Sequence, residues 1–370
     1  MKIGIMTMHR VLNFGSALQA YALQKKLREL DCENELIDYI FPVPQKKKLS
    51  FRNLFLNLII FLRNALIGFP TEKKKQRFHT FRKKYYVVSS KEYNHKNINQ
   101  KPPIYDLYLT GSDQVWSPRH VKDNTDFMFP FAPVNAKIVS YAASFAVDSI
   151  PAEYQNSYAN ALSRYSFITV RESFGCNIVR QLTGKSAYTV CDPTLLLEKK
   201  DWDLLANDAA SSEKSPYILV YILTYMYNPY PKVENLIKVV QQELGYKVIY
   251  LNGRTQDFCK PNSKIIKDSG PCEFLNLIRN AKFVITTSFH GVALACAYNI
   301  PFYGIVENKE HKGDRIHSLL QELNCMESLI AYDEIPKLKK GEEIKYACNK
   351  ENLSRFRDKS IELLSQMIKM

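Results

Sequence analysis

Short apolar runs alternate with longer segments of helical periodicity along most of the chain. The runs predict buried strands at 3–7, 106–110, 138–141, 167–170, 188–190, 217–223, 247–251, 283–286 and 302–305. Segments 16–30, 233–244 and 291–298 have the length and spacing of helices. Buried strands joined by helices predict parallel sheets built from βαβ units. We therefore expect an α/β protein.

The chain has 370 residues, which is long for one domain. Residues 208–216 (DAASSEKSP) are polar and end in proline, as expected of a linker. We predict a first domain at 1–207, a second at 217–345 and an amphipathic C-terminal helix at 351–370. Two doubly wound domains that face each other place a cleft between the carboxyl ends of their strands, where ligands are expected.

Polar residues follow the first predicted strand, where Asn13, Gly15 and Ser16 open a helix. The free N–H groups of such a helix start favour an anion, although an ordinary capped loop would use the same residues. After the next strand come Gly111, Ser112 and Asp113. The carboxylate could act as a base or hold a sugar hydroxyl, or it could simply cap a helix.

Arg171 ends a predicted strand dominated by apolar residues. A guanidinium there can bind a carboxylate or phosphate of a substrate, or it can form a structural salt bridge. Asp192, in the sequence Cys-Asp-Pro-Thr, also follows a strand. We interpret it as part of a turn rather than of a catalytic site.

The strongest candidate lies where a buried strand turns into a small-residue helix, at Thr287, Ser288 and His290. Of the seven histidines, His290 is the one placed between two buried elements. It could be a structural histidine bonded to a carbonyl, or it could gain a proton when an anionic substrate binds and then act as a general acid.

Several other chemistries have no support in the sequence. There is no paired Asp-x-Asp motif, no phosphate-binding Gly-x-x-x-x-Gly-Lys-Ser/Thr run and no Gly-x-Gly-x-x-Gly run. The eight cysteines form no Cys-x-x-Cys pair and are expected to be free thiols. We therefore expect no metal and no resident cofactor.

Seven segments together resemble the polysaccharide pyruvyl transferase family. They are NFGSALQAYAL at 13–23, LTGSDQVW at 109–116, SYAASF at 140–145, VRES at 170–173, CDPTLLL at 191–197, AKFVITTSFHG at 281–291 and NIPFYGI at 299–305. The resemblance implies two Rossmann-like domains in the glycosyltransferase-B arrangement. It also implies transfer of the carboxyvinyl unit of phosphoenolpyruvate to two hydroxyls of a sugar, forming a ketal and releasing phosphate.

The resemblance assigns roles to individual residues. His290 matches the family's catalytic histidine, which would protonate the methylene carbon of phosphoenolpyruvate. Arg171 matches an arginine that binds the anionic donor, and Asp113 matches an aspartate near it. Better-known members carry an arginine two residues before that histidine. Because Ser288 stands there in this chain, a donor contact is missing or comes from elsewhere, for example from Arg315.

The net charge of +14 is concentrated in one segment. Residues 43–101 hold fifteen Lys or Arg and two acids, which is +13 and leaves +1 for the rest of the chain. We interpret 43–103 as a basic insertion in the first domain, with an amphipathic helix at 49–69. Residues 46–84 could bind an anionic membrane, which would suit a lipid-linked acceptor, or form a helix packed on the first domain. Nucleic acid is not an expected partner, because no binding motif accompanies the charge.

The start of the chain lacks the features of a secretory signal, so a cytoplasmic protein is expected, one that could lie on the inner face of the membrane. Two alternatives stay open. One is a glycosyltransferase that uses a nucleotide sugar in the same cleft. The other is a non-catalytic basic adaptor at the membrane, in which substitutions of Arg171 and His290 would be silent.

Overall fold

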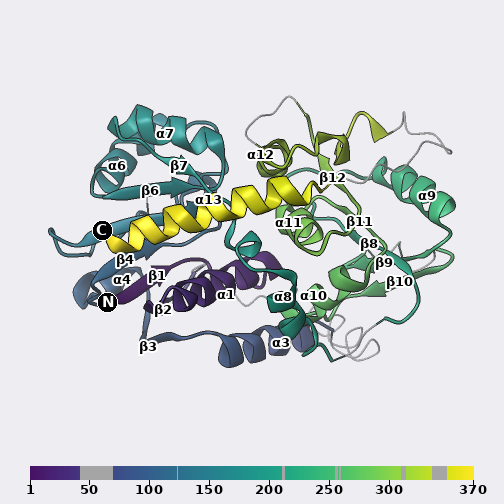
Figure 1. The fold of residues 1–370 in the computed structure, drawn as a ribbon, viewed down its shortest axis with the longest axis horizontal. Helices are drawn as coiled ribbons and strands as arrows, with labels where there is room; N and C mark the ends of the chain where they lie inside the picture. Colours follow the sequence, from purple (N-terminus) through teal and green to yellow (C-terminus); the bar gives the residue numbers. More distant parts are fainter. Residues whose placement is uncertain are drawn as a thin grey trace, which may run out of the picture.

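The computed structural model describes residues 1–41, 70–122, 124–210, 213–254, 257, 260–309, 314–335 and 348–370. They form two parallel sheets, each flanked by helices (Figure 1). The first domain contains a seven-stranded sheet in the order β3-β2-β1-β4-β5-β6-β7. Its strands are β1 (Lys2–Met6), β2 (Glu33–Tyr39), β3 (Val88–Tyr93), β4 (Leu107–Thr110), β5 (Lys137–Ala143), β6 (Phe167–Val170) and β7 (Tyr188–Thr189).

The second domain contains a six-stranded sheet in the order β10-β9-β8-β11-β12-β13. Its strands are β8 (Tyr217–Tyr221), β9 (Lys247–Leu251), β10 (Ser263–Ile266), β11 (Phe283–Thr286), β12 (Phe302–Val306) and β13 (Leu329–Ala331). Every pairing in both sheets is parallel, with β1 beside β4 and β8 beside β11 in the middle. The two-sheet α/β architecture predicted from the sequence is therefore confirmed.

Helices connect the strands. In the first domain they are α1 (Phe14–Glu29), α3 (Pro70–Tyr85), α4 (His95–Gln100), α5 (Pro118–Val121), α6 (Ala152–Ser163), α7 (Ser173–Thr183) and α8 (Lys199–Ala206). In the second they are α9 (Val233–Leu244), α10 (Pro271–Asn280), α11 (Phe289–Tyr298) and α12 (Arg315–Glu322). The last helix is α13 (Lys350–Lys369). Short 3-10 helices in the described residues include η1 (Asp126–Met128), η2 (Pro193–Leu195) and η4 (Met326–Ser328).

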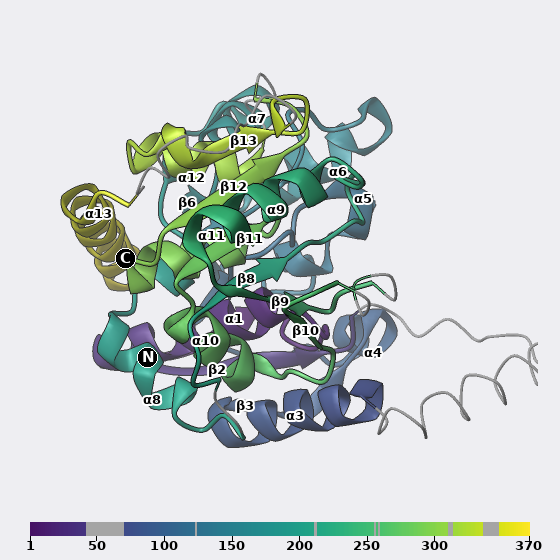
Figure 2. The same cartoon turned by 90° about the vertical axis from the view of Figure 1, so that its right-hand side faces the viewer.

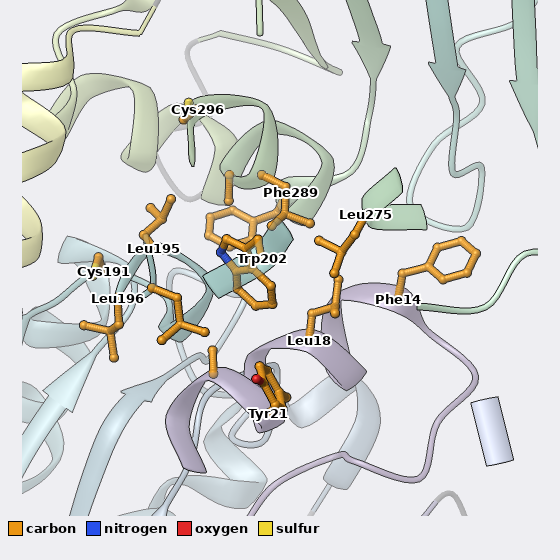
Figure 3. Close-up of a cluster of buried hydrophobic side chains, with 14 of the residues drawn as sticks. Phe14, Leu18, Tyr21, Cys191, Leu195, Leu196, Trp202, Leu275, Phe289 and Cys296 are labelled. Atoms are coloured by element: carbon orange, nitrogen blue, oxygen red, sulfur yellow. The ribbon is translucent and has the colours of Figure 1, made fainter. Parts of the chain in front are cut away.

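One apolar cluster crosses from the first domain into the second. It joins α1, the segment after β7 and α8 to α10 and α11. Figure 3 shows Leu18, Leu195 and Trp202 of the first domain beside Phe289 and Leu275 of the second. Burial of apolar side chains on both sides of this interface holds the domains face to face with about 25 cal/mol per Å² of buried surface.

The C-terminal helix α13 lies across both domains (Figure 1). Near its start, Asn352 Nδ2 donates to the carbonyl of Leu323 in the second domain. Further along, Arg357 Nε donates to the carbonyl of Leu195 in the first domain, and Ser360 Oγ accepts from the backbone N–H of Cys191. The helix therefore connects the two domains by direct hydrogen bonds.

The predicted basic insertion at 43–103 is only partly within the described residues. Its first part, which includes the predicted amphipathic helix at 49–69, lies outside them. From residue 70 onward this part supplies α3 and the edge strand β3, which pairs with β2. Phe78 and Phe81 of α3 are buried in the interdomain cluster. In Figure 2, α3 lies along the lower edge of the first domain.

Candidate active site

The site forms where the first turns of α1 and α11 meet. Each helix begins with a side-chain cap: Asn13 Oδ1 accepts from Ser16 N at 3.2 Å, and Ser288 Oγ accepts from Gly291 N at 3.3 Å. A Cβ added to Gly15 would lie 1.9 Å from His290 Nδ1. Glycine is therefore the only residue at position 15 that leaves room for the imidazole where it stands.

His290 is buried, with 6 % of its surface exposed. Its Nε2 lies 3.6 Å from Asp192 Oδ2, beyond hydrogen-bond distance, and it has no hydrogen-bond partner among the described residues. A buried ring nitrogen without a partner is unusual, because such groups are normally satisfied. The nitrogen is thus free to bond a substrate, and the Asp192 carboxylate lies close to it.

Asp192 is the site residue that the sequence interpretation missed. Its Oδ1 accepts from the backbone N–H and the hydroxyl of Thr194, which is the turn chemistry we predicted. Its Oδ2 accepts from Ser112 Oγ at 2.9 Å and from Arg171 Nη1 at 3.0 Å, and it faces His290. One carboxylate therefore shapes the turn with one oxygen and serves the site with the other.

Arg171 lies at the end of β6 and is 5 % exposed. Its Nε donates to Glu172 Oε1 at 3.1 Å and its Nη1 to Asp192 Oδ2, but Nη2 has no partner among the described residues. The guanidinium stacks on the Phe289 ring, 4.4 Å from the ring centroid. The residue forms the structural ion pair that was one of the two predicted alternatives, and its Nη2 stays without a partner among the described residues.

Asp113 comes directly after β4 and its short loop, with a positive φ of 83°. Its Oδ2 accepts from Ser16 Oγ and its Oδ1 from Gln114 N. Burial by itself raises the pKa of Asp113, but the nearby charges of His290 and Arg171 outweigh it and lower the pKa overall. Asp113 is therefore an ionised acceptor at neutral pH, positioned by the helix start that contains Gly15.

The same balance between burial and neighbouring charges sets the pKa values of Asp192 and Arg171. Burial raises the pKa of Asp192, yet His290 and Arg171 lower it well below its ordinary value. Burial lowers the pKa of Arg171, and the carboxylates of Glu172, Asp192 and Asp113 more than reverse that effect. Three carboxylates thus surround one guanidinium and one imidazole, and Asp113 and Asp192 are held in their ionised form.

The remaining predicted site residues have structural contacts. Thr287 Oγ1 exchanges hydrogen bonds with the backbone of Leu223, which joins the ends of β8 and β11. The Ser288 hydroxyl caps α11, and its backbone N–H donates to Thr286 Oγ1. Gly111 N donates to the carbonyl of Met6. The Ser288 hydroxyl is therefore already used as a helix cap.

Arg315, the first residue of α12, lines a cavity of about 190 Å³ together with Arg119, Thr287 and Phe289. With the Gln114 amide turned so that its nitrogen faces His120, its oxygen accepts from Arg315 Nη1 at 2.8 Å. Among the described residues, neither arginine forms an ion pair. Asp314 and Glu307 also line this cavity, but the Asp314 carboxylate caps α12.

The structure brings most of the predicted site together. Asn13, Gly15, Ser16, Ser112, Asp113, Arg171 and His290 are connected through direct contacts or through Asp192. Arg315 and Thr287 lie in the adjacent cavity, which shares Phe289 with this group. Phe289 was not predicted as a site residue. The signal that could have identified it is its position directly before His290 in the sequence.

A model of the polysaccharide pyruvyl transferase family matches residues 13–309, which cover most of the chain and every predicted site residue except Arg315. The chain belongs to this family, and family membership implies a transferase that acts on a polysaccharide or other glycan. No curated protein sequence matches the chain.

Solved structures of other enzymes share the fold. A UDP-GlcNAc 2-epimerase of Methanocaldococcus jannaschii, in complex with UDP-GlcNAc and UDP, has a TM-score of 0.50 at 12% identity, with 97% of this chain and 99% of that chain covered. The wall teichoic acid polymerase TagF has a TM-score of 0.50 at 10% identity, with coverages of 100% and 88%. A UDP-N-acetylglucosamine 2-epimerase of Rickettsia bellii has a TM-score of 0.50 at 9% identity, with coverages of 99% and 94%. These similarities establish the glycosyltransferase-B-like arrangement.

Proposed function

We propose that the chain transfers the carboxyvinyl unit of phosphoenolpyruvate to two hydroxyls of one sugar in a cell-surface polysaccharide or its lipid-linked precursor. The observation that carries this proposal is His290, a buried imidazole with an unpartnered Nε2 that faces an ionised carboxylate at 3.6 Å. It belongs to a chain of the pyruvyl transferase family. Such a group is suited to deliver a proton to a neutral carbon.

In the proposed reaction, protonated His290 gives its proton to the methylene carbon of phosphoenolpyruvate, which makes C2 electrophilic. One sugar hydroxyl adds to C2, and phosphate leaves with the electron pair of its C–O bond. The second hydroxyl then adds to C2 and completes the ketal. Of the two hydroxyl protons released, one restores His290 and the other goes to the departing phosphate. We assign to the ionised Asp113 carboxylate the role of accepting a hydrogen bond from an attacking hydroxyl.

The donor carries about three negative charges at neutral pH and needs cationic partners. Arg171 offers one free nitrogen, because its other two bond Glu172 and Asp192. We assign the remaining donor contacts to Arg315 and Arg119, which line the adjacent cavity without acidic partners among the described residues. This assignment would compensate for Ser288, whose hydroxyl is used as a helix cap.

Membrane association is a separate part of the proposal. On α3, Lys73, Lys75 and Lys83 are exposed, whereas Arg77 and Lys84 form ion pairs with Asp268, Glu273 and Asp208. Within the ranges that the structure describes, no helix is both long and apolar enough to cross a membrane. We infer that segment 46–84 binds anionic lipid headgroups. Sedimentation with phosphatidylserine vesicles, which neutralisation of the three exposed lysines should weaken, tests this point.

The decisive experiment measures phosphate release from phosphoenolpyruvate and ketal formation with a panel of lipid-linked saccharides. His290→Gln should lower kcat by about 10²- to 10⁴-fold, because general acid catalysis contributes that much. His79, an exposed histidine of α3, provides the matched control: His79→Gln should leave the rate unchanged. Arg171→Lys keeps the charge but loses the planar contacts, and should raise the KM for phosphoenolpyruvate.

Other outcomes would identify the alternatives. Consumption of a nucleotide sugar with no phosphate release from phosphoenolpyruvate would move the function to glycosyl transfer. Full activity of His290→Gln in either reaction would remove the catalytic role of this residue. Vesicle binding with no turnover of any donor would support the non-catalytic adaptor.

A further inference from the structure

A second cavity also has Phe289 in its lining. It has a volume of about 300 Å³ and runs between the end of β7, α12 and α13. Ligand sites in proteins have volumes of roughly 300–1,000 Å³, so it can take one small ring. Because Phe289 lines both cavities, they approach each other at the residue directly before His290.

Buried polar groups close the inner end of this cavity. Arg171 and Asp192 line it, and Arg171 Nη2 has no hydrogen-bond partner among the described residues. A buried hydrogen-bond donor without a partner lowers the stability of the protein by about 1–3 kcal/mol unless a ligand or water accepts from it. Asp192 Oδ2, which lies beside it, also faces His290 Nε2 at 3.6 Å. A sugar hydroxyl that donates to Asp192 Oδ2 would therefore lie next to the proposed general acid, while Arg171 Nη2 stays available to phosphoenolpyruvate.

The walls and the mouth of this cavity are lined by other kinds of residues than its inner end. Phe289 and Phe356, from α11 and α13, contribute aromatic rings to the lining. Gln321 and Glu322 of α12 are exposed and lie at the mouth. Aromatic faces combined with amide, carboxylate and guanidinium groups suit a sugar, because the rings contact its C–H faces and the polar groups bond its hydroxyls.

The two cavities differ in the charged residues that line them. The cavity beside Phe356 has two carboxylates, Asp192 and Glu322, against one guanidinium, which is already bonded to Asp192 and Glu172. A donor with about three negative charges would be repelled there. The other cavity lined by Phe289 also has two carboxylates, Glu307 and Asp314, but it has two guanidiniums, Arg119 and Arg315, which form no ion pair among the described residues.

We propose that the cavity bounded by Arg171, Asp192, Phe289, Phe356, Gln321 and Glu322 binds the acceptor sugar as a neutral ring, while the donor enters from the Arg119–Arg315 side. This assignment rests on the proposed pyruvyl transfer and adds the location of its acceptor. The hydroxyls to be bridged would lie at the inner end, and the rest of the glycan would leave past Gln321 and Glu322. Helix α13 thereby contributes a residue to acceptor specificity.

The test is a steady-state comparison of two variants of α13. Phe356→Ala should raise the KM for the acceptor about tenfold, the equivalent of one lost ring contact, with the KM for phosphoenolpyruvate and kcat unchanged. Met367→Ala is the matched control, because Met367 is fully buried in the same helix and does not line the cavity. It should destabilise the protein without changing either KM.

A second pair of variants tests the same cavity with substitutions that remove no packing contacts. Glu322→Gln should raise the acceptor KM severalfold, whereas Glu362→Gln, an exposed carboxylate of α13 away from the cavity, should have no effect. If either cavity variant raises the KM for phosphoenolpyruvate instead, the donor occupies this cavity and the proposal is wrong. The proposal also fails if both KM values stay unchanged in both cavity variants.

Binding without turnover separates this proposal from the proposed function. Saturation-transfer NMR with a panel of methyl hexopyranosides, in the absence of any donor, should detect contact with the wild type and a weaker signal with Phe356→Ala. If the wild type binds such a sugar but makes no ketal, the proposed function fails and the acceptor cavity stands. If the wild type makes ketal and Phe356→Ala binds the sugar equally well, only the cavity assignment fails.

Discussion

The helices α1 and α11 begin in the same way and differ at the second helical residue. Each has a side-chain cap followed by phenylalanine, in Asn13-Phe14 and Ser288-Phe289. The next residue is Gly15 in one helix and His290 in the other, and the imidazole occupies the space that the glycine leaves open. Two similar helix starts from different domains thus combine into one site, in which one supplies the reactive group and the other supplies the room for it.

The loops that precede these helices are held by different interactions. Before α1, His9 and Arg10 bond the Asp38 carboxylate, and Arg10 also bonds Glu92. Before α11, the hydroxyls of Thr286 and Thr287 bond the backbone of Tyr221 and Leu223. The first loop depends on charged groups and the second on neutral ones. Their responses to acid should therefore differ.

The largest effect is expected when the space at position 15 is filled. Gly15→Ala would place a Cβ 1.9 Å from His290 Nδ1, so the ring or the whole helix must shift. A displacement of about 1 Å at a reacting group can cost about 10²-fold in rate. We expect kcat for ketal formation to fall by at least about 10²-fold, measured by phosphate release. Gly184→Ala, at the open end of α7, should leave kcat unchanged.

A double-mutant cycle tests whether the imidazole is the cause. Gly15→Ala should lower the free energy of unfolding by about 1–3 kcal/mol, the usual cost of overpacking. In the background of His290→Ala the same substitution should cost little, because the clashing ring is absent. Equal losses in both backgrounds would show that Gly15 is needed for another reason.

The second largest effect is expected in the dependence of the unfolding free energy on pH. Burial raises the pKa of Asp38, but the hydrogen bonds from His9 and Arg10 outweigh it and lower the pKa to about 2. A carboxyl with a lowered pKa contributes stability that is fully present above its ordinary pKa of 3.8 and is lost as the pH falls toward 2. Between these limits the wild type should lose about 2 kcal/mol of unfolding free energy that Asp38→Asn does not lose.

Denaturant unfolding at a series of pH values measures this difference. Thr287→Val removes a neutral hydrogen bond of the other loop, so its cost should be the same at pH 3 and at pH 6. A pH-independent difference between the wild type and Asp38→Asn would mean that the Asp38 carboxylate is not stabilised by its cationic neighbours.

The smallest effect separates capping from catalysis at Ser288. Ser288→Ala removes the bond to Gly291 N and should cost about 1 kcal/mol of stability, and Asn13→Ala should cost a similar amount in α1. Ser288→Thr should retain the cap. If Ser288 only caps the helix, the KM for phosphoenolpyruvate stays constant in all three variants. A selective rise of this KM in Ser288→Ala would instead place the hydroxyl on the donor.

The sequence pattern was sufficient for strands that are continuous apolar runs and insufficient for four short or polar strands that lie at the sheet edges or, for β2, next to one. β6, β9 and β11 have the predicted bounds, because buried strands consist of continuous apolar runs. β2, β3, β10 and β13 were not predicted. β2 is interrupted by charged residues, β3 has two buried positions, β10 has none, and β13 has three residues. Their pairing depends on the neighbouring strand more than on their own sequence.

The candidate site was predictable where one residue has one role. His290 and Arg171 stand out because a polar group at the end of a buried strand has few structural explanations. Asp192 was missed because its Asp-Pro-Thr sequence does form the expected turn, and a second role of the same carboxylate leaves no trace in the sequence. Phe289 was missed because its stacking on Arg171 is a contact between domains.

The path of α13 determines how the two halves of the protein can move. The chain passes from the first domain to the second after α8, and α13 brings it back, since its early residue Asn352 bonds Leu323 and its last residue, Met370, accepts from Lys137 Nζ. The second domain is therefore connected to the first at two places, by the segment after α8 and by helix α13. A rotation about the line through these two connections would stretch neither of them, so we expect any opening between the two domains to follow that axis.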